Sequence, residues 1–228
     1  MNKKTDLLGF EYSLQTLIAH DVHLGHYYKK WNPKMSPYLL GIRNDLHIID
    51  LEKTVIMLKR ALHAVRTAAR ENAQILFVSN NPSDHKNYAF FVENAAKKCN
   101  QPYLNRRWIG GILTNYIYFK EQIKNINDQL STTSNQTTYK KYQKFLLNTH
   151  GIQKMTSLPS LIFIVGIKES HQILKEANKL NIPTIGIIDS NTDPSLVTYP
   201  IPGNDDSIQA VHLYCQLISN AILDATKK

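Results

Sequence analysis

The sequence predicts an α/β fold in which a parallel sheet is covered by helices on both faces. Largely apolar runs at residues 75–78, 158–165 and 183–189 are typical of strands buried on both sides. Segments with helical periodicity alternate with these runs, which favours right-handed crossover connections. The chain has 228 residues, 43% of them hydrophobic, so a sizeable core is expected.

The N-terminal third is expected to hold two helices. Residues 10–20 place Leu14, Leu17 and Ile18 on one helical face, and a long helix is expected to start at Asp50, which would cap it. The apolar face of that long helix comprises Leu51, Val55, Leu58, Leu62 and Val65. Between the two helices, residues 41–45 predict a turn and residues 47–49 a brief extended piece.

The remaining chain alternates helices with strands, apart from one interruption. The expected elements are helix 84–99, strand 102–105, helix 114–130, helix 139–148, strand 158–165, helix 168–180, strand 183–189, a candidate strand at 197–201, and helix 207–225 with Asp205, Asp206 or Ser207 as its cap. Two successive helices around the polar tract 131–138 predict a helical hairpin that projects from the body.

The charge balance favours an anionic partner. The chain carries 27 basic and 18 acidic residues, a net charge of +9, and such an excess favours nucleic acid or another anionic surface. Residues 29–70 hold nine basic and three acidic residues, a local net charge of +6. This asymmetry predicts a one-sided electrostatic footprint.

Residues 105–115 combine cations, an aromatic ring, two glycines and an amide. Arg106 and Arg107 can fork onto phosphate oxygens, Trp108 can stack on a base or sugar, and Asn115 adds a neutral donor and acceptor. This combination favours a surface that grips an anionic ligand. The alternative is an ordinary loop between a strand and a helix, with Trp108 buried in the core.

Residues 27–38 alternate aromatic rings with amines. Two prolines are expected to hold this stretch extended, as suits a surface that follows a phosphate backbone. The alternative is a proline-pinned loop whose aromatic rings pack on the body. The residues expected to contact RNA are Lys29, Lys30, Trp31, Asn32, Lys34, Arg43, Asn44, Arg106, Arg107, Trp108 and Asn115.

The sequence offers few candidates for a metal site or a catalytic site. His20, His23 and His26 have a spacing of three, but no Cys or Glu ligand is placed nearby, so structural or RNA-facing histidines are favoured and no metal is expected. Cys99 and Cys215 lie far apart and are expected to be buried thiols. Asp189 and Asp193 follow a strand and support the alternative of a nucleotide or small-molecule enzyme, although no phosphate loop or nucleophile elbow accompanies them.

Several stretches, in order along the chain, resemble one family. They are residues 23–26 with 31–35, residues 47–53, residues 105–115, and residues 159–183 followed by 189–194 and 201–206. Together they resemble the bacterial-type ribosomal protein S-two, the second protein of the small ribosomal subunit. The resemblance implies a flavodoxin-like sheet with a protruding helical hairpin, no catalysis and no cofactor. It also implies small-subunit rRNA and neighbouring ribosomal proteins as partners.

The expected organisation follows from these observations. Residues 1–113 and 159–228 would form the α/β RNA-binding body, and residues 114–158 a shortened hairpin insertion. No run approaches the roughly 18 apolar residues of a membrane helix, so no membrane partner is expected. The chain is rich in Asn, Lys, Ile and Tyr, a bias typical of AT-rich genomes, and the hairpin is shorter than the resemblance to bacterial members implies. Both features favour a mitochondrial protein, with a plastid or the bacterial cytoplasm as alternatives.

Overall fold

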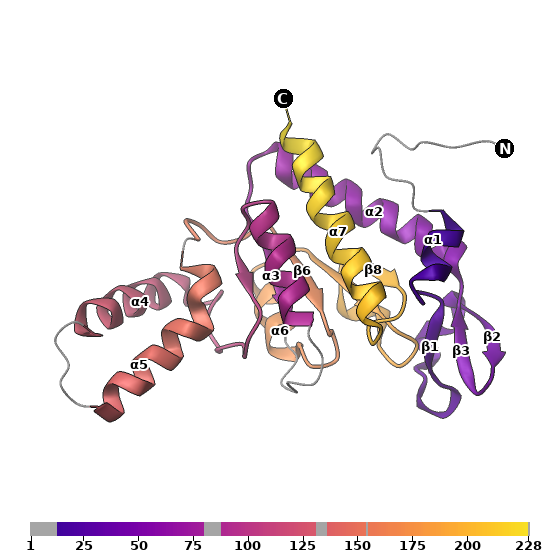
Figure 1. Cartoon of the computed structure of the whole chain (residues 1–228), viewed down its shortest axis with the longest axis horizontal. Coiled ribbons are helices and arrows are strands. Elements are labelled where there is room, and N and C mark those ends of the chain that lie inside the picture. The colour runs from indigo at the N-terminus through magenta and orange to yellow at the C-terminus, as the bar shows by residue number, and fades with distance from the viewer. Residues whose placement is uncertain (1–12, 80–87, 131–135, 154, 228) are drawn as a thin grey trace.

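A five-stranded parallel sheet lies at the centre of the molecule (Figure 1). The computed structural model describes residues 13–79, 88–130, 136–153 and 155–227. The strands are β4 (Ile75–Ser79), β5 (Tyr103–Leu104), β6 (Leu161–Val165), β7 (Thr184–Ile188) and β8 (Tyr199–Pro202), arranged in the order β5-β4-β6-β7-β8. Counted along the chain within this sheet, the order is 2-1-3-4-5, which is the flavodoxin-like arrangement. The predicted fold class is therefore confirmed.

Helices cover both faces of this sheet because its side chains alternate between two apolar cores. Helices α2 (Leu51–Arg70), α3 (Tyr88–Lys98) and α7 (Ile208–Thr226) pack with Phe77 and Phe163 on one face. Helix α6 (His171–Lys179) packs on the other face with Leu76, Ile162 and Ile164. Strands β4, β5, β6 and β7 each contribute to both cores, as the continuous apolar runs of β4, β6 and β7 predicted, whereas β8 contributes Ile201 to the first core.

The expected caps of the two longest helices are confirmed. Asp50 accepts hydrogen bonds from the backbone amides of Glu52 and Lys53 at the start of α2. Ser207, one of three candidates, accepts from the amide of Ala210 at the start of α7. Both side chains satisfy amides that have no partner within the helix.

A second, antiparallel sheet lies at the N-terminal end of the body and was not predicted as such. Its strands are β1 (Leu24–Tyr27), β2 (Leu39–Arg43) and β3 (Leu46–Ile49), in the order β1-β3-β2. The turn expected at residues 41–45 is confined to Asn44 and Asp45, whose φ angles of 50° and 62° suit a tight hairpin. Residues 41–43 belong to β2, so that part of the turn prediction is wrong.

Most of the stretch from Tyr28 to Tyr38 is not extended, and only Trp31 and Asn32 keep extended backbone angles. It forms two 3-10 helices, η1 (Tyr28–Lys30) and η2 (Pro33–Tyr38). The φ that proline imposes is compatible with a 3-10 turn as well as with an extended chain. Asn32 also caps η2 through its side chain, and this local bond favours the turn.

Helices α4 (Tyr116–Leu130) and α5 (Gln136–Thr149) form the predicted hairpin, which projects from the body at the left of Figure 1. The rings of Phe119 and Phe145 pack 5.8 Å apart between them. Of the polar tract 131–138, residues 131–135 lie outside the described residues, and residues 136–138 already belong to α5.

Two predicted helices extend beyond what the structure describes. Helix α1 (Leu14–Ala19) is the described part of the helix expected at 10–20, and residues 10–12 lie outside. Residues 84–87 of the helix expected at 84–99 also lie outside. None of the described helices combines the length and apolar character that crossing a bilayer requires.

Candidate nucleic-acid interface

The first basic segment, residues 27–38, presents its cations and one aromatic ring to solvent. Lys29 and Lys30 are exposed on η1, directly after β1. Trp31 is 40% exposed, and its ring lies 5.3 Å from that of His47. One face of the indole is thereby supported by the protein, and the exposed part remains available for stacking.

Asn32 and Lys34 are engaged with the body. The amide of Asn32 donates to the carbonyl of Ser190 at 2.8 Å, and its side chain accepts from the amide of Lys34. The Lys34 ammonium lies 2.6 Å from the Asp193 carboxylate. Hydrogen bonds from Lys34 and Ser195 lower the pKa of Asp193 below its usual value. Lys34 therefore carries a partly compensated charge, whereas Arg43 and Asn44 are exposed on the hairpin between β2 and β3.

The second basic segment, residues 105–115, has exposed cations and a buried aromatic ring. Arg106 and Arg107 are exposed directly after β5. Trp108 is 4% exposed and packs in the core with Ile112 and Ile164. The prediction that Trp108 contacts RNA is therefore wrong, because its ring faces the protein interior, and the alternative of a core residue holds.

One carboxylate from α6 organises the loop behind the two arginines. Glu176 accepts hydrogen bonds from the Trp108 indole and from the backbone amides of Gly111, Leu113 and Thr114. Burial alone would raise the pKa of Glu176, but these donors outweigh it and lower the pKa. Gly111 has a φ of +92°, a conformation that favours glycine. Asn115 is exposed next to α4, and its carbonyl accepts from the amide of Phe119.

The two basic segments lie at the carboxyl ends of strands in the central sheet, but they do not form one cluster. Arg106 and Arg107 follow β5, whereas Asn32 and Lys34 contact residues that follow β7. Three strand spacings separate β5 from β7, or about 14 Å. A ligand that touches both segments must therefore be extended, as a nucleic-acid backbone is.

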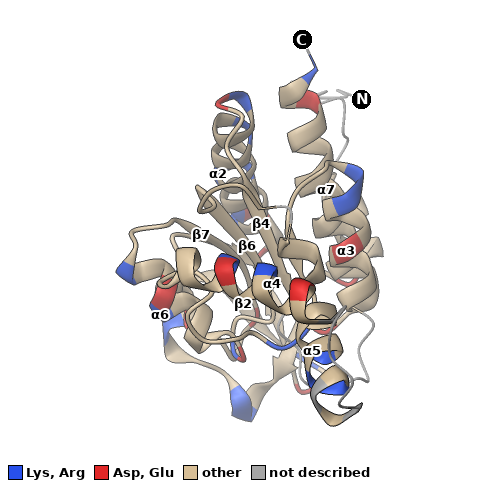
Figure 2. Ribbon diagram, turned by 90° about the vertical axis from the view of Figure 1, so that its left-hand side faces the viewer, with Lys and Arg blue, Asp and Glu red and all other residues tan. Residues whose placement is uncertain are grey.

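Sequence reasoning missed a third group of cations on the hairpin. Helix α5 carries Lys140, Lys141 and Lys144 and no acidic residue. Figure 2 shows lysines and arginines on this hairpin as well as on the loops beside the sheet. The run of cations on one short helix was the available signal.

An acidic cluster lies where β1 meets the residues that follow β7 and β8. The ring of His26 is 3.1 Å from Asp189 through Nδ1 and 3.1 Å from Asp206 through Nε2. These hydrogen bonds raise the pKa of His26 to about 10. Burial and the charges of Asp189 and Asp206 raise the pKa of Asp205 to about 8. His20 is engaged elsewhere, through a 2.8 Å hydrogen bond to the carbonyl of Thr16.

The two acids of the enzyme alternative are bound to different partners. Asp189 pairs with His26 and Asp193 with Lys34. Each carboxylate thus joins the N-terminal segment to the sheet, which is a structural use of both groups.

The sequence of this chain matches the family model described as ribosomal protein S2 over residues 17–225. The chain belongs to the ribosomal protein S2 family. It is 42% identical to the small ribosomal subunit protein uS2 of Gluconobacter oxydans, an alignment that covers 94% of this chain and 83% of the relative. The uS2 protein of Acidiphilium cryptum is 41% identical, and the alignment covers 93% of this chain and 85% of the relative. The uS2 protein of Ehrlichia chaffeensis is 35% identical, and the alignment covers 95% of this chain and 77% of the relative.

The match to the S2 family covers every part of the candidate interface. Residues 17–225 contain both basic segments, the acidic cluster and the α4–α5 hairpin. These relatives come from bacteria.

Proposed function

We propose that this chain is a structural constituent of the small ribosomal subunit, and that it binds small-subunit rRNA through its basic segments. The observation that carries the RNA-binding part is the construction of the loop after β5. Arg106 and Arg107 are exposed beside Trp108, which is buried and bonded to Glu176. A loop anchored in this way presents two fixed guanidinium groups, which suit bidentate contacts with phosphates.

The other predicted contacts would contribute in different ways. Lys29, Lys30 and Arg43 would neutralise phosphates, and Trp31 would stack on a base or sugar. Asn32, Asn44, Lys34 and Asn115 would act mainly by shaping the surface. Such contacts hold a protein in position and need not read sequence.

The hairpin is proposed to act as an insertion distinct from the body. Residues 114–158 would form this shortened insertion, and residues 1–113 with 159–228 the RNA-binding body. The lysines of α5 and its exposed Leu147 support contacts with rRNA or a neighbouring ribosomal protein. The role is proposed to be non-catalytic. Saturable nucleotide binding by the purified, RNA-free protein would contradict this and favour the enzyme alternative.

The decisive experiment compares two double variants in a cell that depends on this protein. Arg106→Ala/Arg107→Ala is expected to shift the protein from small subunits to the top of a sedimentation gradient, while its melting temperature stays unchanged. The matched control is Lys175→Ala/Lys179→Ala, which removes two exposed cations from α6. Ribonuclease treatment should release the wild-type protein. Normal incorporation of the arginine variant would refute the assignment of these residues.

We propose a mitochondrial location, with a plastid or the bacterial cytoplasm as alternatives. The AT-rich coding bias and the short hairpin support a location in an organelle, whereas the relatives named for comparison come from bacteria. Cell fractionation, with this protein followed beside mitochondrial and cytosolic markers, would decide among them.

A further inference from the structure

The acidic cluster joins three elements that are far apart in the sequence. His26 lies on β1 of the N-terminal sheet, Asp189 follows β7, and Asp205 and Asp206 follow β8. The His26 amide donates to the hydroxyl of Ser190 at 2.8 Å, which fixes the backbone of β1 against the loop after β7. His26 is therefore held in place through its backbone amide and through both nitrogens of its imidazole ring.

The orientation of the imidazole is that of a metal ligand. Nδ1 of His26 faces Asp189, which is 1% exposed. The Oδ2 atom of Asp189 is buried and has no hydrogen-bond partner beyond this ion-pair contact with His26 within the described structure. A buried carboxylate behind one ring nitrogen sets the tautomer and aims the other nitrogen at the ion in many metal sites. Here the other nitrogen, Nε2, points toward Asp206.

Three ligand atoms converge in front of Nε2. One atom each from His26, Asp205 and Asp206 lies within 4.8 Å of the other two. Bonds of about 2.0–2.2 Å to a tetrahedral ion would place the ligand atoms roughly 3.5 Å apart, so small rotations of the aspartates are sufficient. A cavity of about 240 Å³ adjoins these atoms and also contains Glu169 and Asn191, which leaves room for water.

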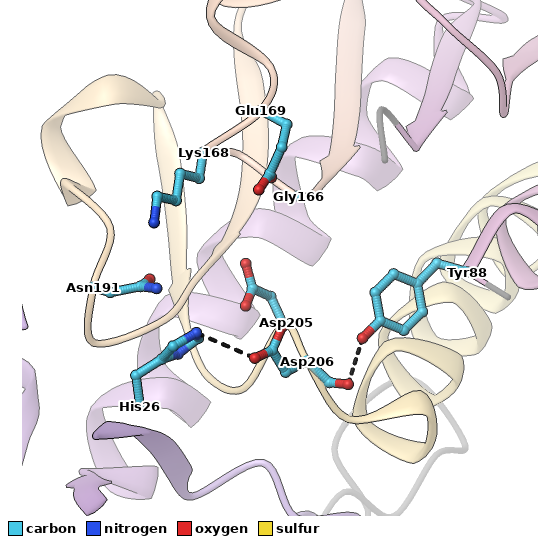
Figure 3. A pocket seen from close by; sticks show the side chains of 8 residues that line it. All are labelled: His26, Tyr88, Gly166, Lys168, Glu169, Asn191, Asp205 and Asp206. Atoms are coloured by element: carbon cyan, nitrogen blue, oxygen red, sulfur yellow. Dashed lines mark hydrogen bonds and ion pairs between the residues drawn. The ribbon is translucent and has the colours of Figure 1, made fainter. Parts of the chain in front are cut away.

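The charge of the cluster favours a cation. Among the described residues, four acidic side chains, those of Asp189, Asp205, Asp206 and Glu169, lie near two cationic side chains, His26 and Lys168, and a bound cation would favour the ionised form of Asp205. Figure 3 shows Asp205 and Glu169 pointing toward one another across the cavity. Among the described residues, no hydrogen bond holds the Asp205 carboxylate. A divalent ion would offset this excess of negative charge.

We propose that His26, Asp205 and Asp206 bind a divalent transition-metal ion such as Zn²⁺, with Asp189 orienting the imidazole. A donor set of one imidazole nitrogen and carboxylate oxygens suits Zn²⁺ better than Mg²⁺, which prefers oxygen ligands alone. Binding replaces the contact between His26 and Asp206, and the protons on Nε2 of His26 and on the Asp205 carboxyl group are released to solvent. The ion would fasten the N-terminal sheet, and the basic segment that follows it, to the α/β body. This inference is independent of the ribosomal role.

The test uses the full-length protein, stripped with a chelator and titrated with ZnCl₂ or with MgCl₂. Wild type should bind one Zn²⁺, and Zn²⁺ at 100 times its Kd should raise the melting temperature by about 5–10 °C. Mg²⁺ at the same concentration should not reproduce this shift. Asp189→Asn should keep the stoichiometry and weaken binding roughly 10–100-fold, as expected of a positioning residue.

Two ligand variants and one control complete the experiment. His26→Gln and Asp205→Asn should lose the single site, and Asp205→Asn is expected to fold even if His26→Gln does not, because no described hydrogen bond depends on its charge. His63→Gln replaces an exposed histidine on α2 and should bind as wild type does. Zn²⁺ binding that survives Asp205→Asn unchanged, equal binding of Mg²⁺, or no stoichiometric binding by wild type would each overturn the proposal.

Discussion

The indole of Trp108 donates a 2.9 Å hydrogen bond to the carboxylate of Glu176, a residue 68 positions away. The same carboxylate accepts from the amides of Gly111 and Leu113 at 2.8 and 3.0 Å. Helix α6 therefore holds the part of the loop from Trp108 to Thr114 through one side chain, while Asn105 at its start is bonded to Glu93 of α3. The exposed Arg106 and Arg107 therefore lie on a loop that is anchored to α6 through Glu176.

Replacing Glu176 is expected to destabilise the protein. Glu176→Ala leaves several donors of this loop without an acceptor, and we expect the free energy of unfolding to fall by about 2–4 kcal/mol. Glu176→Gln retains one acceptor oxygen and should lose less. Urea denaturation measures both, and Lys175→Ala, one position earlier on the exposed face of α6, is the control. A loss below about 0.5 kcal/mol for the alanine variant would show that the loop is held by other contacts.

The same carboxylate predicts a dependence on acid. Its pKa is lowered from the ordinary value of 4.5 because its hydrogen bonds favour the charged form. The stability that Glu176 adds is present above pH 4.5 and is lost as the pH falls through the lowered pKa. The difference in unfolding free energy between wild type and Glu176→Gln should therefore shrink below about pH 4. A constant difference between pH 3 and pH 7 would argue against this origin.

The two tryptophans are expected to respond in opposite ways. Trp108→Ala removes a side chain that is 4% exposed and should cost about 3–5 kcal/mol of stability. Trp31→Ala removes a ring that is 40% exposed, so it should cost less than about 1 kcal/mol and instead weaken binding of rRNA fragments. Thermal unfolding and filter binding measure the two effects. Unchanged RNA affinity in the Trp31 variant would remove that residue from the interface.

His26 predicts a loss of stability in alkali for the metal-free protein. Hydrogen bonds to Asp189 and Asp206 raise its pKa to about 10 from 6.5. The added stability is complete below pH 6.5 and is lost as the pH rises through about 10. We expect His26→Gln to be less stable by on the order of 3 kcal/mol at neutral pH, and nearly equal to wild type above pH 10. Urea denaturation in EDTA across this range is the measurement, with His20→Gln as control.

The pair of Lys34 and Asp193 predicts how salt affects RNA binding. Asp193→Asn releases the Lys34 ammonium, so the slope of the logarithm of affinity against the logarithm of salt concentration should steepen by about 1. Asp224→Asn breaks a similar exposed pair with Lys227 on α7 and is the matched control. An unchanged slope in the Asp193 variant would show that Lys34 does not face phosphate.

The central fold was predictable because its signal is local. Residues 75–79 are apolar almost throughout since β4 is buried on both faces, and the same holds for β6 and β7. The N-terminal sheet lacked such a signal. Leu40 and Ile42 of β2 are exposed apolar side chains, and β1 pairs with β3 and also donates a hydrogen bond from the His26 amide to Ser190, which follows β7.

The candidate site was predictable in its cations and not in its details. Arg106 and Arg107 stand out by composition, whereas the burial of Trp108 depends on Glu176, which the local sequence does not indicate. The acidic cluster was missed for the same reason, because His26 meets Asp189 and Asp206 only when the ends of β7 and β8 come together.

The sequence by itself determined the α/β class, the hairpin and the excess of positive charge, since periodicity, apolar runs and net charge are properties of neighbouring residues. The tertiary structure alone decided which aromatic ring is exposed and which cation is paired. It also decided which carboxylates share one histidine. These outcomes depend on distances between residues as far apart as His26 and Asp206, which the order of strands sets and no local pattern encodes.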